Sequence, residues 1–139
     1  MLEVKAKWMG GFRFDGEDSE GRAMKMDASK EGGGTGGGFR PAELPLMGLA
    51  GCTGIDTVEI LKKMRQEVTA FSLTVSSKKK EGYPAGYDGI HVAYEVHGKG
   101  LDEEKVEKAV RLSEEKYCTV GQALSKATTI THTITIIED

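Results

Sequence analysis

Two cysteines are the residues of this chain whose type and setting could do chemistry. Cys52 lies in the apolar and small-residue stretch LPLMGLAGCTGID, and Cys118 lies about half the sequence later in LSEEKYCTVGQALSKAT. Both settings are typical of helices, and a thiolate is a nucleophile that can be oxidised reversibly. The two thiols therefore indicate a redox pair that the fold brings together, or else two small residues that fill space in a core.

The composition favours one soluble domain over residues 1–139. The chain is 38% apolar and 29% charged, with a formal net charge of -3, and this acidic balance argues against nucleic acid as a partner. The first residues lack the order of a signal peptide, and no apolar run approaches the roughly 18 residues of a membrane span. We therefore expect a cytoplasmic protein with no membrane partner, in which a Cys52–Cys118 disulfide would be a catalytic or sensing state.

Hydrophobic alternation predicts three short strands before the first cysteine. They are expected at residues 2–8, 12–14 and 22–26, and the glycine run at 31–38 predicts a flexible loop after them. Residues 44–55 are apolar or small almost throughout, which predicts a helix buried on all sides, and the stripe at 57–64 predicts that this helix continues with one exposed face.

The second half of the chain predicts two strands, two helices and a last strand. Alternation marks strands at 71–76 and 90–97, joined by KKKEGYPAGYDG, and the acidic first turn after Asp102 predicts a helix that ends near Cys118. A short helix is expected at 120–126 and a strand at 129–136. The prediction is an α+β fold of order βββ-α-ββ-α-α-β.

The two cysteine motifs resemble those of a known family. RPAELPLMGLAGCTGID and EKYCTVGQAL, in this order and within these elements, are similar to the OsmC/Ohr family of thiol-dependent peroxidases, most of all to its YhfA-like branch. The resemblance covers essentially the whole chain. It implies an OsmC-like fold, in which the long cysteine helices form the centre of an intertwined homodimer and antiparallel sheets wrap them. It also implies the reduction of organic hydroperoxides to alcohols without a cofactor or metal.

The resemblance assigns a role to each cysteine. Cys52 matches the peroxidatic position, where a thiolate attacks the peroxide and becomes a sulfenic acid. Cys118 matches the resolving position, where it would condense with that sulfenic acid to a disulfide that a dithiol reductant resets. Apolar residues around both motifs favour an organic hydroperoxide over hydrogen peroxide as the substrate.

The family also implies an arginine that polarises the site. Arg22, in EGRAM, resembles the Gly-Arg element of the family and is our candidate catalytic arginine. Arg13 and Arg40 are the alternatives, because the match around Arg22 extends over only two residues.

A glutamate is implied next to the arginine, and here the chain departs from the family. Alignment on Cys52 places Ala42 at the glutamate position, with Glu43 one residue away and therefore about 100° further around a helix. Glu43 is nevertheless the candidate catalytic carboxylate. Asp56 is a second departure, because it follows Cys52 by one helical turn and its charge would oppose thiolate formation unless an arginine pairs with it.

Three readings of function follow. The first is a thiol peroxidase that uses Cys52 and Cys118 with an arginine. The second is a redox-sensing or non-catalytic dimer of the same fold that binds a small apolar ligand in its interfacial pocket, and the third is a structural dimer with inert thiols. No metal spacing joins the cysteines to the three histidines, and His132, in register with Ile130 and Ile134, is interpreted as a core histidine.

Overall fold

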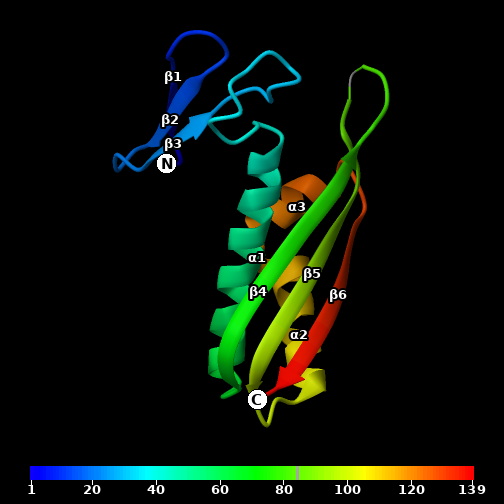
Figure 1. The fold of residues 1–139 in the computed structure, drawn as a ribbon. Coiled ribbons are helices and arrows are strands. Elements are labelled where there is room, and N and C mark those ends of the chain that lie inside the picture. The colour runs from blue at the N-terminus through cyan, green and yellow to red at the C-terminus, as the bar shows by residue number, and fades with distance from the viewer. Residues whose placement is uncertain (84) are drawn as a thin grey trace. The chain divides into compact units, whose positions relative to one another are not determined.

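The computed structural model describes residues 1–83 and 85–139 and contains two compact units, 1–45 and 46–139 (Figure 1). Pro84, in the loop predicted between the fourth and fifth strands, lies outside the described residues. The order βββ-α-ββ-α-α-β is confirmed, with a π-helical turn added before the second cysteine. The elements are β1 (Val4–Trp8), β2 (Phe14–Asp18), β3 (Ala23–Met26), α1 (Glu43–Lys63), β4 (Glu67–Lys79), β5 (Tyr87–Lys99), α2 (Glu103–Leu112), η1 (Ser113–Tyr117), α3 (Thr119–Ser125) and β6 (Ile130–Glu138).

The first unit is an antiparallel meander in the order β1-β2-β3. The sequence prediction placed the second strand at 12–14, but β2 begins at Phe14, opposite Trp8, and runs through the acidic residues to Asp18. Gly10 and Gly11 adopt positive φ angles of 99° and 55°, so the chain is still turning at residue 12. The acidic residues fit a strand here because the register places Asp15 opposite Lys7 and Glu17 opposite Lys5.

The glycine run at 31–38 is held by a buried carboxylate, which corrects the expectation of a flexible loop. Asp27 is 3% exposed and accepts hydrogen bonds from the backbone N–H of Ala28 at 2.8 Å and of Thr35 at 3.2 Å, and from the Thr35 hydroxyl. The Thr35 hydroxyl bond holds the pKa of Asp27 below its usual value. The loop needs glycine where its backbone passes close to Ala28 and Lys25.

Gly34 marks the closest of these approaches, and its replacement by alanine is expected to destabilise the protein. A Cβ at this position would lie 2.1 Å from the carbonyl oxygen of Ala28 and 2.6 Å from Oδ1 of Asp27. We expect Gly34→Ala to lower the free energy of unfolding by about 1–3 kcal/mol, as overpacking does, measured by urea denaturation. Gly86→Ala is the matched control, since no atom lies within 4 Å of its added Cβ. A Gly34→Ala protein as stable as wild type would show that the close approach at Gly34 does not require glycine.

The second unit contains a three-stranded sheet in the order β4-β5-β6, with its core on one face. Alternate residues of β5, from Ile90 to Val96, are buried against α1 and α2, and the core cluster around them includes Cys118. Strand β6 runs parallel to β5, so this sheet is mixed where an antiparallel one was expected. The crossover through α2, η1 and α3 returns the chain to the starting end of β5, which permits the parallel pairing (Figure 1).

Helix α1 buries only one face in this chain, whereas full burial was expected for its first half. Leu49, Thr53 and Thr57 are buried, but Ile55 is 71% exposed and Met47 54% exposed. The reason is geometric, because the sheet of a single chain covers one side of the helix. By length and composition α1 is also the one helix among the described residues that could span a membrane, contrary to the sequence expectation, although core helices of soluble proteins pass the same test.

Candidate active site around two cysteines

The two cysteines lie in side-chain contact. Cys52 is half-buried on α1, and Cys118 is fully buried at the start of α3. Both are free thiols, and their side chains interact as hydrogen-bonding partners. Residues 66 positions apart are therefore brought together by the packing of α1 against the segment between α2 and α3.

The backbone around Cys118 fixes the position of its sulfur. Its N–H donates to the carbonyl of Ser113 at 2.7 Å, which closes the π-helical turn η1. Its Sγ in turn accepts a hydrogen bond from the N–H of Gly121 at 3.2 Å and caps α3. A Cβ at Gly121 would lie 3.2 Å from this sulfur, so the glycine leaves room for the thiol. π-Helical turns are rare in proteins, and many of those that occur lie at functional sites.

The environment gives the two thiols unequal chemistry. Burial raises the pKa of the Cys118 thiol to about 12, and the hydrogen bond to Cys52 and the charge of Asp56 act in the same direction, against the amide of Gly121. Cys118 is therefore a neutral thiol at physiological pH and a poor first nucleophile. Cys52 is the thiol with access to solvent. This asymmetry is what a pair with one attacking and one resolving thiol requires.

A buried hydrogen-bond network joins the backbone beside Cys52 to the backbone before Cys118. Thr53, the residue after Cys52, lies 2.9 Å from the hydroxyl of Tyr94 and 2.9 Å from that of Ser113, which also donates to the Thr53 carbonyl at 3.2 Å. The Tyr94 hydroxyl donates to Glu114 at 2.8 Å. Burial is the main cause that raises the pKa of Tyr94, which therefore remains a donor. The network links α1, β5 and η1.

Tyr94→Phe is expected to destabilise the protein through this network. The substitution removes a buried hydroxyl that bonds both Thr53 and Glu114 and leaves their oxygens short of a partner. The expected loss is about 1–3 kcal/mol in the free energy of unfolding, measured by urea denaturation. Tyr83→Phe serves as control, because Tyr83 is fully exposed; a Tyr94→Phe protein as stable as this control would show that the network contributes nothing.

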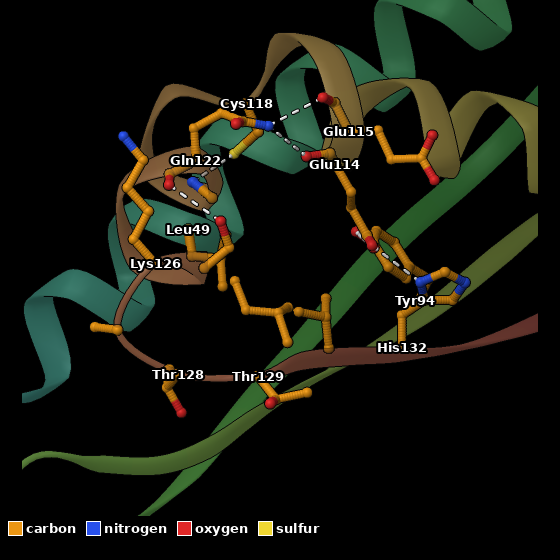
Figure 2. Close-up of a pocket in the computed structure, with 15 residues that line it drawn as sticks. Leu49, Tyr94, Glu114, Glu115, Cys118, Gln122, Lys126, Thr128, Thr129 and His132 are labelled. Carbon is orange, nitrogen blue, oxygen red and sulfur yellow. Dashed lines mark hydrogen bonds and ion pairs between the residues drawn. The ribbon is translucent and has the colours of Figure 1, made fainter.

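A pocket of about 820 Å³ adjoins Cys118 within the second unit. Figure 2 shows Tyr94 and His132 at one side of it and Cys118 with Gln122 along another. His132 was expected in the core, but it is exposed at the pocket, and its Nδ1 lies 3.0 Å from the Glu114 carboxylate. The correction has a simple cause, since β6 is an edge strand and the helices leave this end of its inner face open.

The polar residues of this network and pocket were missed in the sequence. The signal that could have found two of them is a hydroxyl at a core position: Thr53 lies in an apolar helix, and Tyr94 is in register with Val92 and Val96. Glu114 gave no such signal, because it lies among other charged residues near the end of a helix. Within residues 1–83 and 85–139 no three His, Cys, Asp or Glu side chains gather in a way that could hold a metal ion.

The predicted arginine and glutamate lie in the first unit, each in an ion pair. Arg22 is exposed and pairs with Asp18 at 2.8 Å and with Glu20. Glu43, in the first turn of α1, accepts the backbone N–H of Arg40 at 2.8 Å and faces its guanidinium at 3.5 Å. These bonds hold the pKa of Glu43 below its usual value.

The alternative Arg13 pairs with Asp15 at 2.9 Å, also within the first unit. Each of the three candidate arginines thus has a carboxylate partner of its own in this unit. Their roles at the cysteines, and that of Glu43, stay predictions.

Comparison with known proteins identifies the relatives of this chain. Residues 34–133 match the model of the family described as OsmC-like protein. Protein YhfA of Escherichia coli strain K12 is 35% identical over 136 residues, 98% of each chain. The crystal structure of a hypothetical protein from Aquifex aeolicus VF5 superposes with a TM-score of 0.87 at 29% identity, over 100% of this chain and 98% of that one. An organic hydroperoxide resistance protein OsmC from Legionella pneumophila shares the fold, with a TM-score of 0.73 at 21% identity over 97% and 96% of the chains.

Proposed function

Because the chain belongs to the OsmC-like protein family, which confirms the predicted resemblance, we propose that it is a thiol-dependent peroxidase that reduces organic hydroperoxides to alcohols. The observation that carries this proposal is the contact between a half-buried Cys52 and a fully buried Cys118. The organic hydroperoxide resistance protein from Legionella pneumophila, which has the same fold, supports the choice of substrate class.

The two thiols carry the proposed reaction in two steps. The Cys52 thiolate attacks a peroxide oxygen, the O–O bond breaks, and the alkoxide takes up a proton and leaves as the alcohol, so that Cys52 becomes a sulfenic acid. The Cys118 sulfur then attacks the Cys52 sulfur, the S–O bond breaks, and the hydroxyl group leaves as water. A dithiol reductant restores both thiols by disulfide exchange. In this scheme Arg22, with Glu43, polarises the peroxide.

The proposal includes a homodimer, supported by apolar surface that a single chain leaves uncovered. No apolar side chain of residues 1–45 is buried, and aromatic residues such as Trp8 and Phe12 are 62% and 60% exposed. A three-stranded sheet without an apolar core needs a cover to be stable. The exposed apolar face of α1 also needs a cover. In the proposed homodimer a second copy of the chain covers this face and the sheet of the first unit.

Thiol counting tests the proposed activity. Reduced protein is mixed with one equivalent of cumene hydroperoxide, and separately of hydrogen peroxide, and free thiols are counted over seconds. We expect both thiols to be lost with cumene hydroperoxide, and more slowly with hydrogen peroxide, because the residues around the cysteines are largely apolar. If the thiols persist for many minutes with both peroxides, the peroxidase proposal fails and the alternative of a dimer that binds a small apolar ligand takes its place.

A further inference from the structure

Asp56 is a half-buried carboxylate near the two thiols, and the reaction above does not use it. It follows Cys52 by four residues on α1, which places the two side chains on one face with Cβ atoms about 6 Å apart. Its Oδ2 is buried and has no hydrogen-bond partner within residues 1–83 and 85–139. A buried oxygen without a partner destabilises a fold and is uncommon in native proteins, so its presence here points to a use.

The second step of the proposed reaction needs a proton acceptor beside Cys118. Only a thiolate attacks the sulfenic acid efficiently, and burial and the bond to Cys52 keep Cys118 protonated by raising its pKa to about 12. The interaction of the Cys118 thiol with the Cys52 sulfur weakens once that sulfur is oxidised and becomes electron-poor. The thiol proton then requires a different acceptor.

Asp56 is the carboxylate whose charge acts on the Cys118 thiol, and among the described residues its buried Oδ2 has no hydrogen-bond partner. Tyr94, from β5, remains protonated because burial raises the pKa of its hydroxyl, and that hydroxyl already donates to Glu114. Glu114, from η1, accepts from Tyr94 on one oxygen and lies 3.0 Å from His132 with the other. Gly121, from α3, offers only an N–H to the sulfur. The groups of α1 that act on the Cys118 thiol are the Cys52 side chain and the charge of Asp56.

We propose that Asp56 is the proton acceptor for Cys118 in the step that forms the Cys52–Cys118 disulfide. The proposal rests on the proposed function. The Cys118 S–H bond breaks and its proton passes to the Asp56 carboxylate while the Cys118 sulfur bonds to the Cys52 sulfur. The S–O bond of the sulfenic acid breaks, and the departing hydroxyl group takes the proton from Asp56 and leaves as water, so Asp56 is unchanged at the end.

Asp56→Asn separates the two steps of the reaction, because it keeps the size of the side chain and removes the base. We expect sulfenic acid to form at Cys52 at the wild-type rate or faster, since a negative charge has been removed. Disulfide formation should slow by about 10²- to 10⁴-fold, the usual contribution of a general base. Dimedone trapping followed by mass spectrometry measures the accumulated sulfenic acid, and thiol counting measures the disulfide.

Chemical rescue and pH dependence distinguish a base from a structural residue. In Asp56→Ala, added formate should restore disulfide formation in proportion to its concentration. In Asp56→Asn, the rate should rise steadily with hydroxide between about pH 7 and 10, because no side-chain base remains, whereas the wild-type rate should depend much less on pH there.

Thr57→Val is the matched control, because the Thr57 hydroxyl is the other buried oxygen without a partner among the described residues and lies next to Asp56. It should leave both steps unchanged. Disulfide formation by Asp56→Asn at the wild-type rate would overturn the proposal. An equal slowing of sulfenic acid formation and disulfide formation that formate does not rescue would also overturn it. This second result is expected if Asp56 only pairs with an arginine.

An experiment with diamide in place of the peroxide tests the role of Asp56 independently of the peroxidase activity. Diamide forms an adduct on Cys52 without any peroxide, and Cys118 must still lose its proton to displace that adduct. If wild type ignores cumene hydroperoxide but closes the disulfide with diamide, and Asp56→Asn closes it at least 100-fold more slowly, the role of Asp56 holds and the peroxidase proposal fails. Equal rates with diamide would refute the role of Asp56 alone.

Discussion

Cys52→Ser is expected to lower the rate of cumene hydroperoxide consumption by roughly three orders of magnitude or more, because a serine oxygen cannot be oxidised as the sulfur is to a sulfenic acid and so cannot reduce the peroxide. Among the two thiols, Cys52 is the one that solvent and a peroxide reach, while Cys118 is fully buried and neutral. The measurement is a single-turnover assay of peroxide loss with the reduced protein, followed in the absence of any added thiol.

Cys118→Ser is the matched variant, and its expected behaviour differs in kind. It should consume one equivalent of peroxide at close to the wild-type rate and then stop, with a sulfenic acid at Cys52 that dimedone traps. Serine preserves the position of the N-cap of α3, where Cys118 accepts the N–H of Gly121, so the local fold is expected to remain. Loss of the first turnover in Cys118→Ser, together with its retention in Cys52→Ser, would reverse the assignment of the two roles.

The sequence predicted the order of elements because most of them carry a simple periodicity. Strand β5 alternates strictly, and its apolar residues from Ile90 to Val96 are the ones that the structure buries. The α2 helix begins after Asp102, whose carboxylate accepts the N–H of Glu104, as the acidic first turn suggested. Local patterns of this kind depend on neighbours in the chain and are readable without a structure.

Errors arose where a distant partner decides the structure. The glycine run looked free of constraint because its anchor, Asp27, lies outside it and is recognisable only once its hydrogen bonds with Thr35 are seen. The direction of β6 is another example, because it depends on the crossover and not on the composition of the strand. The burial of the first half of α1 was overestimated, because apolar composition does not tell which faces of a helix a neighbouring element covers.

The sequence pointed to the two cysteines of the candidate site, whose reactivity stays a prediction, and it did not point to the polar residues that hold them in place. Both cysteines were singled out from their motifs, but their contact, across 66 positions of sequence, is a property of the packed core. The network around Tyr94 holds the two helical segments that carry the thiols, and nothing in the spacing of Thr53 and Ser113 announces that their hydroxyls meet. Polar contacts across a core are therefore the part of such a site that a structure adds.

The exposed face of α1 provides the second large prediction, which concerns the homodimer. Met47, Gly51, Ile55 and Val58 follow one another at helical spacing and are all exposed, with Ile55 71% exposed. A stripe of this kind with a glycine lets the backbones of two helices approach closely, and a two-fold axis would bring α1 of one copy against α1 of the other. The apolar character of this face contributes to the length and composition that would let α1 span a membrane.

Ile55→Lys is therefore expected to weaken dimerisation by about three orders of magnitude or more, measured as the dissociation constant by analytical ultracentrifugation. In an isologous interface each substitution occurs twice, so two unpaired ammonium groups would be buried against apolar surface, at a cost of several kcal/mol. Ile137→Lys is the control, because Ile137 is an exposed isoleucine of β6 outside the stripe and should leave the dimer intact. The proposed interface would be contradicted if the wild-type chain sediments as a folded monomer at micromolar concentration, or if Ile55→Lys dimerises with unchanged affinity. A monomeric Ile55→Lys protein whose second unit is still folded would locate the interface on α1.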